Sequence, residues 1–395
     1  MLEVPVAITA VGAVTALGLG PDCLFDGLLA GVRGFGRVER FGVNGCRVQL
    51  AAEVRGDLPV VGSTRTADLA VTAVRNAIAK LPPFVDLSRV GVVLGSAGAG
   101  TAGLEDRLLG IADAPALLRR YTKRELVDEV ARSLGFGGPR HAINTACSSG
   151  AMAVALAADW LRFGDCDVAI AVGADELGRF TYTGFHALRA MDPEPCRPFD
   201  RHRQGLTMGE GAGCVVLERP REARRRGAPI RAFLGAVGQA CDAHHLTAPD
   251  PSGAGPARAI ARALEGAGVE PREVGFINAH GTGTPLNDAA EVSSIEVALG
   301  AAAVECPVHS VKATVGHCMG AAGAIEAVVA VLSLERQLVP HTAGLTDCEF
   351  DGRVRCVRGE PLHVEADFAL STSFGFGGND AAILLAHPRV FEEGT

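Results

Sequence analysis

The chain contains the same order of apolar segments twice, and this internal repeat restricts the fold more than any other feature. Each copy has an initial strand, a second strand that ends in small residues, a third strand that leads into a long apolar helix, and a closing strand. The matching segments are 5–13 and 231–240, 90–98 and 274–284, 141–150 and 308–317, and 211–218 and 377–386. Strands and helices that alternate in this way predict two α/β halves of similar design.

The long apolar helices are expected at 147–163 and at about 318–336. Between the two copies, the charged segment 219–229 contains proline and glycine, which is typical of a solvated connector, with a docking patch as the alternative. We therefore predict an N-terminal half at residues 1–225 and a C-terminal half at residues 226–395.

The composition argues against several classes of protein. Apolar residues make up 48% of the chain and charged residues 21%, which fits a large buried core rather than a disordered chain. The net charge of −8 argues against general nucleic-acid binding. The longest apolar runs are broken by glycines or charges, so no membrane span is expected, and the N-terminus lacks the basic region of a secretory signal. The eleven cysteines include no C-x-x-C pair, so we expect no metal site and no disulfide framework, but a reduced, cytoplasmic protein.

Cys147 is the first candidate for chemistry. It follows the strand-like segment 141–146 and opens an apolar helix. Unpaired N–H groups and the helix dipole favour an anion at this position, so a thiol there is expected to have a lowered pKa. The thiolate is the nucleophilic form of cysteine. A small apolar cysteine packed in the core is the alternative.

Two histidines occupy loops after strands of the second copy. His280 follows the apolar run V-G-F-I and shares its loop with Thr282 and Thr284. His317 holds the position that corresponds to Cys147 in the first copy. If the halves pack as pseudo-mirror copies, a thiolate would face two imidazoles that can stabilise a developing oxyanion. Taken alone, His280 could equally be structural.

Lys312 and Glu326 are predicted to form a supporting ion pair. Glu326 is the only charged residue between Gly320 and Leu334, so we expect it to be buried and to need a partner. Lys312 is a rare lysine in an arginine-rich chain and lies five residues before His317, on the expected preceding strand. Two unrelated residues at a helix edge are the alternative.

The segment S-T-S-F-G-F-G-G-N-D (371–380) is expected to form a tight loop with accessible backbone N–H groups. Such a loop can supply an oxyanion-hole donor and a phenylalanine lid over a pocket. A plain glycine-rich turn is the alternative.

Six motifs in this order resemble the β-ketoacyl-acyl-carrier-protein synthases, in particular the synthase II type and the type II polyketide ketosynthases of the thiolase superfamily. The resemblance covers nearly the whole chain, from about residue 5 to 386. The motifs are T-A-C-S-S-G (145–150), R-P-F-D-R (197–201), G-E-G-A-G (209–213), N-A-H-G-T-G-T (278–284), V-K-A-T-V-G-H-C-M-G-A-A-G (311–323) and F-G-F-G-G (374–378).

This resemblance implies an α/β fold of thiolase type, a five-layer αβαβα sandwich of two pseudo-repeated halves. It implies a decarboxylative Claisen condensation of malonyl-carrier with a Cys-bound acyl chain, in fatty acid or polyketide biosynthesis, with an aryl-polyene pathway as one option. The expected partners are an acyl carrier protein and a second subunit, in a homodimer or in a heterodimer with a ketosynthase-like chain. No cofactor is expected beyond the phosphopantetheine on the carrier.

The resemblance also implies a role for each candidate residue. Cys147 would accept the acyl group, and its N–H and that of Phe376 would form the oxyanion hole, with Phe376 as the gate. His280 and His317 would promote malonyl decarboxylation, and Lys312 and Glu326 would hold the His317 side in place. The expected substrate-binding residues are Thr282, Thr284, Phe374 and Gly377, and the expected carrier-docking residues are Arg119, Arg120, Lys123, Arg124 and Arg203.

Two motifs depart from the usual family pattern. N-T-A precedes Cys147 where D-T-A is more common, and the closing loop reads G-G-N-D where G-G-T-N is usual. Three other types of protein fit the sequence less well. A chain-length factor, the non-catalytic partner subunit, would lack the nucleophile; an initiating synthase would have Asn in place of one histidine; and a degradative thiolase would use a second cysteine.

Overall fold

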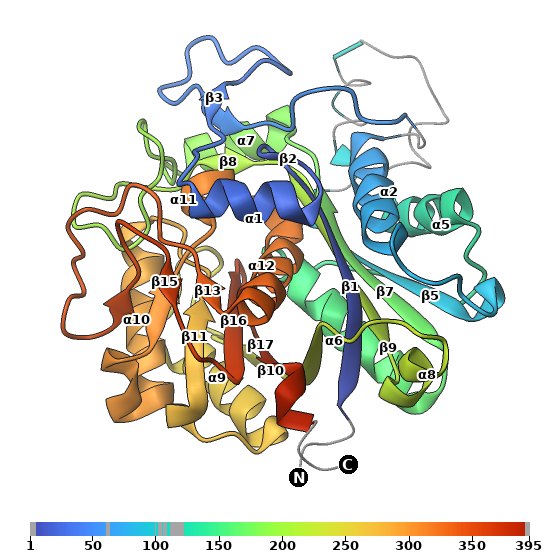
Figure 1. The fold of residues 1–395 in the computed structure, drawn as a ribbon. Helices are drawn as coiled ribbons and strands as arrows, with labels where there is room; N and C mark the ends of the chain where they lie inside the picture. The colour runs from blue at the N-terminus through green and yellow to red at the C-terminus, as the bar shows by residue number, and fades with distance from the viewer. Residues whose placement is uncertain are drawn as a thin grey trace.

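The computed structural model describes residues 5–60, 64–98, 100–101, 105, 109–110 and 122–391. In these ranges, a 12-stranded sheet runs through the molecule in the order β14-β12-β11-β16-β17-β10-β1-β9-β7-β5-β6, with β2 paired to β1 (Figure 1). The antiparallel pair β1–β10, with Val6 opposite Leu234, joins the two parts of this sheet.

The two parts of the sheet have the same strand order, which confirms the repeat expected from the sequence. In each part the order is third, second, fourth, fifth and first strand along the chain. The first part contains β1 (Val6–Thr15), β5 (Val90–Gly95), β6 (Arg140–Ile143), β7 (Val168–Asp175) and β9 (Gly211–Glu218). The second contains β10 (Ala232–Cys241), β11 (Val274–Asn278), β12 (Pro307–His309), β16 (Phe368–Gly375) and β17 (Asn379–Ala386), with β14 (Arg355–Cys356) at the edge. The sequence analysis missed the fourth strand of each part, β7 and β16.

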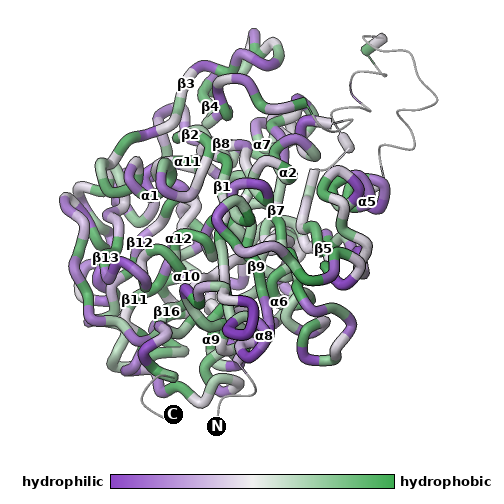
Figure 2. Tube along the Cα trace, turned by 45° about the vertical axis from the view of Figure 1, so that its right-hand side comes forward, coloured by the Kyte–Doolittle hydropathy of each residue, from purple (hydrophilic) through white to green (hydrophobic). Residues whose placement is uncertain are grey.

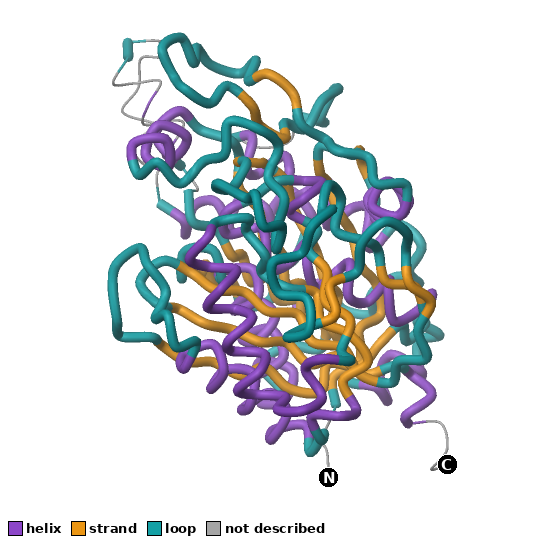
Figure 3. Tube along the Cα trace, turned by 90° about the vertical axis from the view of Figure 1, so that its left-hand side faces the viewer, coloured by secondary structure: helices purple, strands orange, loops and turns teal. Residues whose placement is uncertain are grey.

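Helices form three layers around the two parts of the sheet, which makes the expected five layers. The helices α6 (Ser149–Phe163) and α12 (Ala322–Arg336) lie in the centre, α2 (Arg65–Ile78) and α5 (Lys123–Leu134) cover the first part, and α9 (Ala254–Ala267) and α10 (Pro285–Leu299) cover the second (Figure 1). Figure 3 shows the strands in the interior with helices on both sides.

Alternating side chains on the strands explain this layering. In β9, Val215 and Leu217 belong to the central core, whereas Cys214 and Val216 belong to the core under α2 and α5. Both faces of the strand are therefore apolar, as expected for a strand with helices on each side. Central helix α12 is buried from Ala322 to Leu334, in keeping with the nearly uncharged sequence of this part of the helix.

The remaining elements are short. They are β2 (Gly18–Leu19), α1 (Pro21–Leu29), β3 (Gly36–Arg37), β4 (Leu50–Ala52), η1 (Leu87–Arg89), α7 (Arg179–Ala187), β8 (Met208–Gly209), α8 (Pro220–Arg225), η2 (Pro271–Glu273), η3 (Gly300–Val304), α11 (Lys312–Val315), η4 (Met319–Ala321), β13 (Leu338–Val339), β15 (Leu362–His363) and η5 (Pro388–Phe391). The hydrophilic helix α8 occupies the segment between the two copies (Figure 2), and the division at residue 225 stays a prediction. None of the helices within the described ranges has the length and apolarity needed to cross a lipid bilayer.

Glycines allow the central helices to approach each other and the sheet. A Cβ atom on Gly150 of α6 would lie 2.6 Å from the backbone N of Ala324 in α12, and one on Gly323 would lie 2.7 Å from the N of Ala151. A Cβ on Gly213 of β9 would lie 2.4 Å from the N of Ile325. These contacts involve backbone atoms, which cannot move as a flexible side chain can, so the start of α6 is held against the start of α12.

We expect Gly213→Ala to lower the free energy of unfolding by about 1–3 kcal/mol, because the added methyl group overpacks the contact with α12. Exposed Gly42, whose Cβ would meet no atom within 4 Å, is the matched control, and Gly42→Ala should change stability by no more than about 0.5 kcal/mol. Chemical denaturation of both variants measures the difference. Equal effects would show that close packing at Gly213 is not a constraint.

Candidate active site

Cys147 lies in the tight turn between β6 and α6 and is 4% exposed. The residue before it, Ala146, has a φ of 54°, in the left-handed region that residues other than glycine rarely adopt. Two serine hydroxyls hold this turn: that of Ser148 donates to the Thr145 carbonyl at 2.8 Å, and that of Ser149 donates to the Ala146 carbonyl at 2.6 Å. The turn therefore fixes the Cys147 sulfur beside the N-terminus of a buried helix.

The turn between β16 and β17 packs directly on Cys147. A Cβ atom on Gly375 would lie 2.6 Å from the Thr145 carbonyl oxygen and 3.3 Å from the Cys147 nitrogen, so a larger residue would push the two turns apart. The backbone N–H of Phe376 donates a hydrogen bond to the Cys147 sulfur. The Phe376 ring stacks on that of Phe185, with centroids 5.4 Å apart.

The expectation of a lowered pKa at Cys147 is wrong. Burial raises the pKa of its thiol to about 11, although the ammonium of Lys312 and the Phe376 N–H act in the opposite direction. Loss of hydration outweighs the favourable helix terminus, because the sulfur has almost no contact with water. At neutral pH the unliganded site therefore holds a thiol and not a thiolate.

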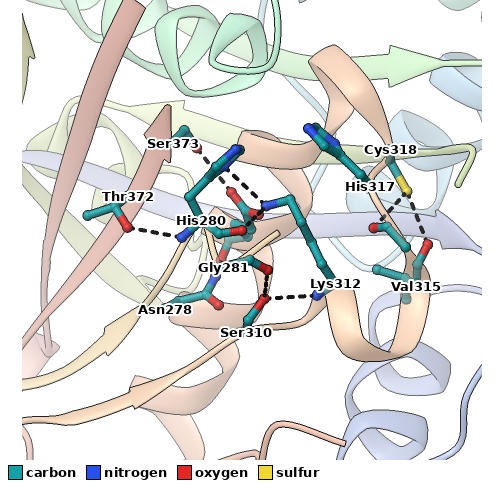
Figure 4. Close-up of polar contacts among 12 residues, drawn as sticks. Asn278, His280, Gly281, Ser310, Lys312, Val315, His317, Cys318, Thr372 and Ser373 are labelled. Atoms are coloured by element: carbon teal, nitrogen blue, oxygen red, sulfur yellow. Dashed lines mark hydrogen bonds and ion pairs between the residues drawn. The ribbon is translucent and has the colours of Figure 1, made fainter. Parts of the chain in front are cut away.

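His280 follows β11, and His317 lies between α11 and η4. Their rings meet edge to face, with centroids 5.4 Å apart, and both residues are 2% exposed. The Nδ1 atom of His317 accepts a hydrogen bond of 3.1 Å from the Met319 N–H. The Nδ1 atom of His280 lies 3.2 Å from the Lys312 Nζ atom (Figure 4). With both Nδ1 atoms used as acceptors, each neutral ring carries its proton on Nε2.

Burial holds the pKa of His280 and the pKa of His317 well below the usual value, and the Lys312 ammonium lowers both further. The two imidazoles are therefore neutral at physiological pH. Each offers an N–H donor and not a positive charge, so they can stabilise negative charge that develops on a bound oxygen.

Lys312 and Glu326 form the expected ion pair, and both are buried. The Lys312 ammonium donates to the Glu326 carboxylate and to the backbone carbonyl of His280, and the Ser373 hydroxyl donates to the other Glu326 oxygen at 3.0 Å. Two details differ from the prediction. Lys312 opens α11 rather than lying on a strand, and its direct contacts are with His280 and not with His317.

A cavity of about 310 Å³ brings the candidate residues together. Its wall includes Cys147, His280, Thr282, Thr284, His317, Phe374, Phe376 and Gly377. The Thr282 and Thr284 hydroxyls lie 2.9 Å apart, and that of Thr284 also caps α10 by accepting the Asn287 N–H. Lys312 and Glu326 lie behind the wall and act on it through His280.

Sequence analysis missed two carboxylates that hold the His280 loop. Glu291 accepts hydrogen bonds from the N–H groups of His280 at 2.8 Å and Gly281 at 2.7 Å. Asp288 accepts one from the Gly283 N–H at 3.2 Å. Both carboxylates lie on one face of α10, three residues apart, and this spacing directly after the G-T-G-T loop is the signal that could have revealed them.

The residues predicted to dock a carrier protein differ in their exposure to solvent. Arg119 and Arg120 lie outside the described residues. Lys123 and Arg124 begin α5, and the Arg124 side chain is 89% exposed. Arg203 does not suit docking: it is 7% exposed and its guanidinium faces Asp288 and Glu349, so its charge is already used inside the protein.

Metal binding finds no support in the described part of the chain, where no three His, Cys, Asp or Glu side chains are grouped as ligands. The groups around the cavity are instead a thiol, two neutral imidazoles and backbone N–H donors. Such a set can accept an acyl group and stabilise oxyanions.

Comparison with known proteins gives consistent matches. Residues 63–223 match the family described as "Beta-ketoacyl synthase, N-terminal domain", and residues 231–346 match "Beta-ketoacyl synthase, C-terminal domain". The chain is 34% identical over 403 residues to 3-oxoacyl-[acyl-carrier-protein] synthase 2 of Synechocystis, covering 96% of this chain and 97% of that protein.

Two solved structures are similar over almost the whole chain. One is a type II polyketide synthase acyl-carrier protein in complex with its ketosynthase bound to the hexaketide, with a TM-score of 0.89, 28% identity, and coverage of 97% of this chain and 99% of that chain. The other is the ishigamide ketosynthase/chain length factor, with a TM-score of 0.88, 32% identity, and coverage of 97% of this chain and 99% of that chain. These matches confirm the thiolase-like fold expected from the motifs.

We expect Lys312→Met to lower the free energy of unfolding by about 3–5 kcal/mol at pH 7, because it leaves Glu326 buried without its counter-charge. Without that cation the pKa of Glu326 rises further above its value in the unfolded chain, so the variant should regain stability as the pH falls and the carboxyl is protonated. Arg389, whose pair with Asp367 is half-exposed, is the control, and Arg389→Met should cost no more than about 1 kcal/mol. Similar small losses in both variants, measured by chemical denaturation, would contradict the importance of the buried pair.

Proposed function

The chain belongs to the β-ketoacyl synthase family, and from this premise we propose that it joins a Cys147-bound acyl group to malonyl-carrier protein with loss of CO2. One observation carries the proposal: Cys147, His280 and His317 line the same cavity, with the Phe376 N–H at the sulfur. Membership makes the chain a condensing enzyme of the acyltransferase class. The roles of single residues, the partners and the pathway are proposals.

In the first half-reaction, Cys147 attacks the thioester carbonyl of an acyl-carrier protein. The N–H groups of Cys147 and Phe376 stabilise the oxyanion, and the intermediate then expels the pantetheine sulfur. One proton moves from the Cys147 thiol to that sulfur, so a thiol is present before and after the step. Because burial raises the pKa of Cys147 and the thiolate is the nucleophilic form, the thiol has to lose this proton as its sulfur attacks the carbonyl.

In the second half-reaction, malonyl-carrier enters and its carboxylate leaves as CO2. The bonding electrons pass to the thioester, which becomes an enolate. The Nε2–H groups of His280 and His317 donate to the enolate oxygen, and low dielectric makes these donors effective. The enolate carbon attacks the acyl-Cys147 carbonyl, the sulfur departs and takes up a proton, and a β-ketoacyl-carrier longer by two carbons remains.

Lys312 keeps the histidines in the required state. Its ammonium lies at the Nδ1 atom of His280, which leaves Nε2 of that ring as the proton carrier. Burial keeps both rings neutral, and the ammonium adds to this effect because it disfavours a second positive charge nearby. Thr282, Thr284, Phe374 and Gly377 are proposed to contact the pantetheine arm.

We propose an acyl carrier protein as the partner that delivers both substrates, and a second ketosynthase-like subunit in a homodimer or heterodimer. The carrier protein is proposed because one similar structure is a ketosynthase in complex with its acyl-carrier protein. The second subunit is proposed because another similar structure is a ketosynthase/chain length factor. The proposal needs no organic cofactor beyond the carrier's phosphopantetheine and places the enzyme in the cytoplasm. Fatty acid and polyketide chains, including aryl polyenes, are the candidate products. A non-catalytic chain-length role is disfavoured because the nucleophilic cysteine is present.

We expect His317→Ala to slow malonyl-carrier decarboxylation at least 100-fold and acyl transfer to Cys147 less than about tenfold, because its Nε2–H serves only the enolate. The two half-reactions are measured by CO2 release and by intact-mass analysis of the acylated enzyme. His202→Ala, at a side chain that is 70% exposed, is the control and should change neither rate. Equal loss of both half-reactions in His317→Ala would contradict this division of roles.

Reversing the charge of Lys123 and Arg124 to Glu should raise the KM for an acidic carrier protein at least fivefold and leave kcat within about twofold, because the residues act in docking and not in chemistry. Exposed Arg272, in η2, is the control position, and Arg272→Glu should leave the KM unchanged. A KM unaffected by reversal at Lys123 and Arg124 would remove them from the docking surface.

A further inference from the structure

The departure G-G-N-D places an aspartate, Asp380, at the start of β17, beside the cavity. Asp380 is 4% exposed, and its Oδ2 atom is buried without a donor from any other described residue. The Oδ1 atom of Asp242, which follows β10, is buried without such a donor too. Both aspartates line the same cavity as Cys147.

Both of these oxygens lie close to Gly255 of α9. A Cβ atom on Gly255 of α9 would be 2.0 Å from the Asp242 Oδ1 atom and 2.6 Å from the Asp380 Oδ2 atom. Two ionised carboxylates in one buried site repel each other, whereas a proton held by one of them can be donated to the other. Asp242 also accepts the Asp250 N–H on its other oxygen at 3.0 Å, so we assign the proton of the pair to Asp380.

The charged groups near Asp380 do not balance a second negative charge beside Asp242. Arg258 of α9 lowers the pKa of Asp380, but its guanidinium donates to the Cys241 carbonyl at 2.9 Å. Burial and the neighbouring Asp242 act more strongly and raise the pKa of Asp380 to about 8. The other charged or titratable groups from the adjoining elements are Cys241 on β10, His244, His245 and Asp250 in the following loop, and Arg262 and Glu265 on α9.

The pair lies at the base of the turn that carries Phe376. The Asp242 N–H donates to the Gly378 carbonyl at 2.9 Å, and the Gly377 N–H donates to the Leu246 carbonyl at 2.8 Å. A Cβ atom on Gly378 would lie 2.7 Å from the Asp242 Cβ atom. Movement of Asp242 away from Asp380 would therefore disturb the contacts of Asp242 with Gly378 in this turn.

We propose that Asp242 and Asp380 share one proton, and that this protonated pair holds the turn at 375–378 in the position from which the Phe376 N–H reaches Cys147. The two aspartates are positioning residues, since they contact the turn and not the reacting atoms. Loss of the shared proton places two charges in a buried site and releases the turn. The catalytic part of this inference rests on the proposed function, whereas the shared proton does not.

Thermal unfolding of Asp380→Asn tests the shared proton without any substrate. Asparagine keeps the shape of the side chain but cannot ionise. The pKa of Asp380 is higher in the folded chain than its ordinary value of 3.8, so the wild-type residue lowers stability increasingly as the pH rises from about 4 to about 8. The variant should therefore gain in Tm over the wild type, by an amount that grows from pH 5 to pH 8.5. The control Asp250→Asn should show no such gain, and a difference for Asp380→Asn that does not change with pH would overturn the shared proton.

The pH dependence of condensation tests the positioning role. Above about pH 8, kcat of the wild type should fall about tenfold per pH unit, the slope of one ionisation, and Asp250→Asn should follow it. Asp380→Asn should lose this alkaline fall and keep its activity at pH 7, whereas Asp380→Ala should lower kcat more than KM at every pH. An alkaline fall that persists unchanged in Asp380→Asn would overturn the positioning role. Failure of every form, wild type included, to condense any carrier substrate would instead count against the proposed function, and the unfolding comparison would still decide the shared proton.

Discussion

The buried ammonium of Lys312 is the interaction on which the site depends. A cation without water must be balanced, and it is balanced here by Glu326 of the central helix α12 and by the backbone carbonyl of His280. Lys312 and these two partners come from three separate segments of the second half, so the ion pair forms only when that half of the chain has closed around it. Once formed, the ion pair orients His280. Its ammonium adds to the effect of burial that keeps both imidazoles neutral, and it partly offsets the rise that burial causes in the pKa of the Cys147 thiol.

Close packing brings the nucleophile to this cation. Cys147 belongs to the first copy of the repeat and the two histidines to the second, so the distance between them is set by how tightly α6 and α12 meet. Gly150 of α6 and Gly323 of α12 have no side chain, so each lies directly against backbone atoms of the other helix. The rich supply of small residues in this chain therefore has a function: it lets two buried helix termini share one cavity, where desolvation strengthens every N–H donor.

Features carried by a local pattern could be predicted from the sequence, whereas features that depend on distant contacts could not. An apolar strand followed directly by small residues is a local pattern. It predicts the repeat, the turn before α6 and the loops that carry His280 and His317. The pKa of Cys147 was predicted in the wrong direction because burial by the rest of the fold outweighs the helix terminus. Arg203 was expected on the surface, but Asp288 and Glu349, both more than eighty positions along the chain, hold it inside. The pairing of Asp380 with Asp242 is equally non-local.

The central claim is that the Cys147 sulfur, facing two neutral imidazoles, is the group that takes up the acyl chain. The most direct measurement is peptide mass mapping after the enzyme has been mixed with a panel of acyl-carrier proteins in the absence of malonyl-carrier. The account predicts a single acyl adduct on the peptide that contains Cys147, which disappears when malonyl-carrier is added. An adduct on another cysteine, or a stable adduct that malonyl-carrier does not discharge, would contradict it.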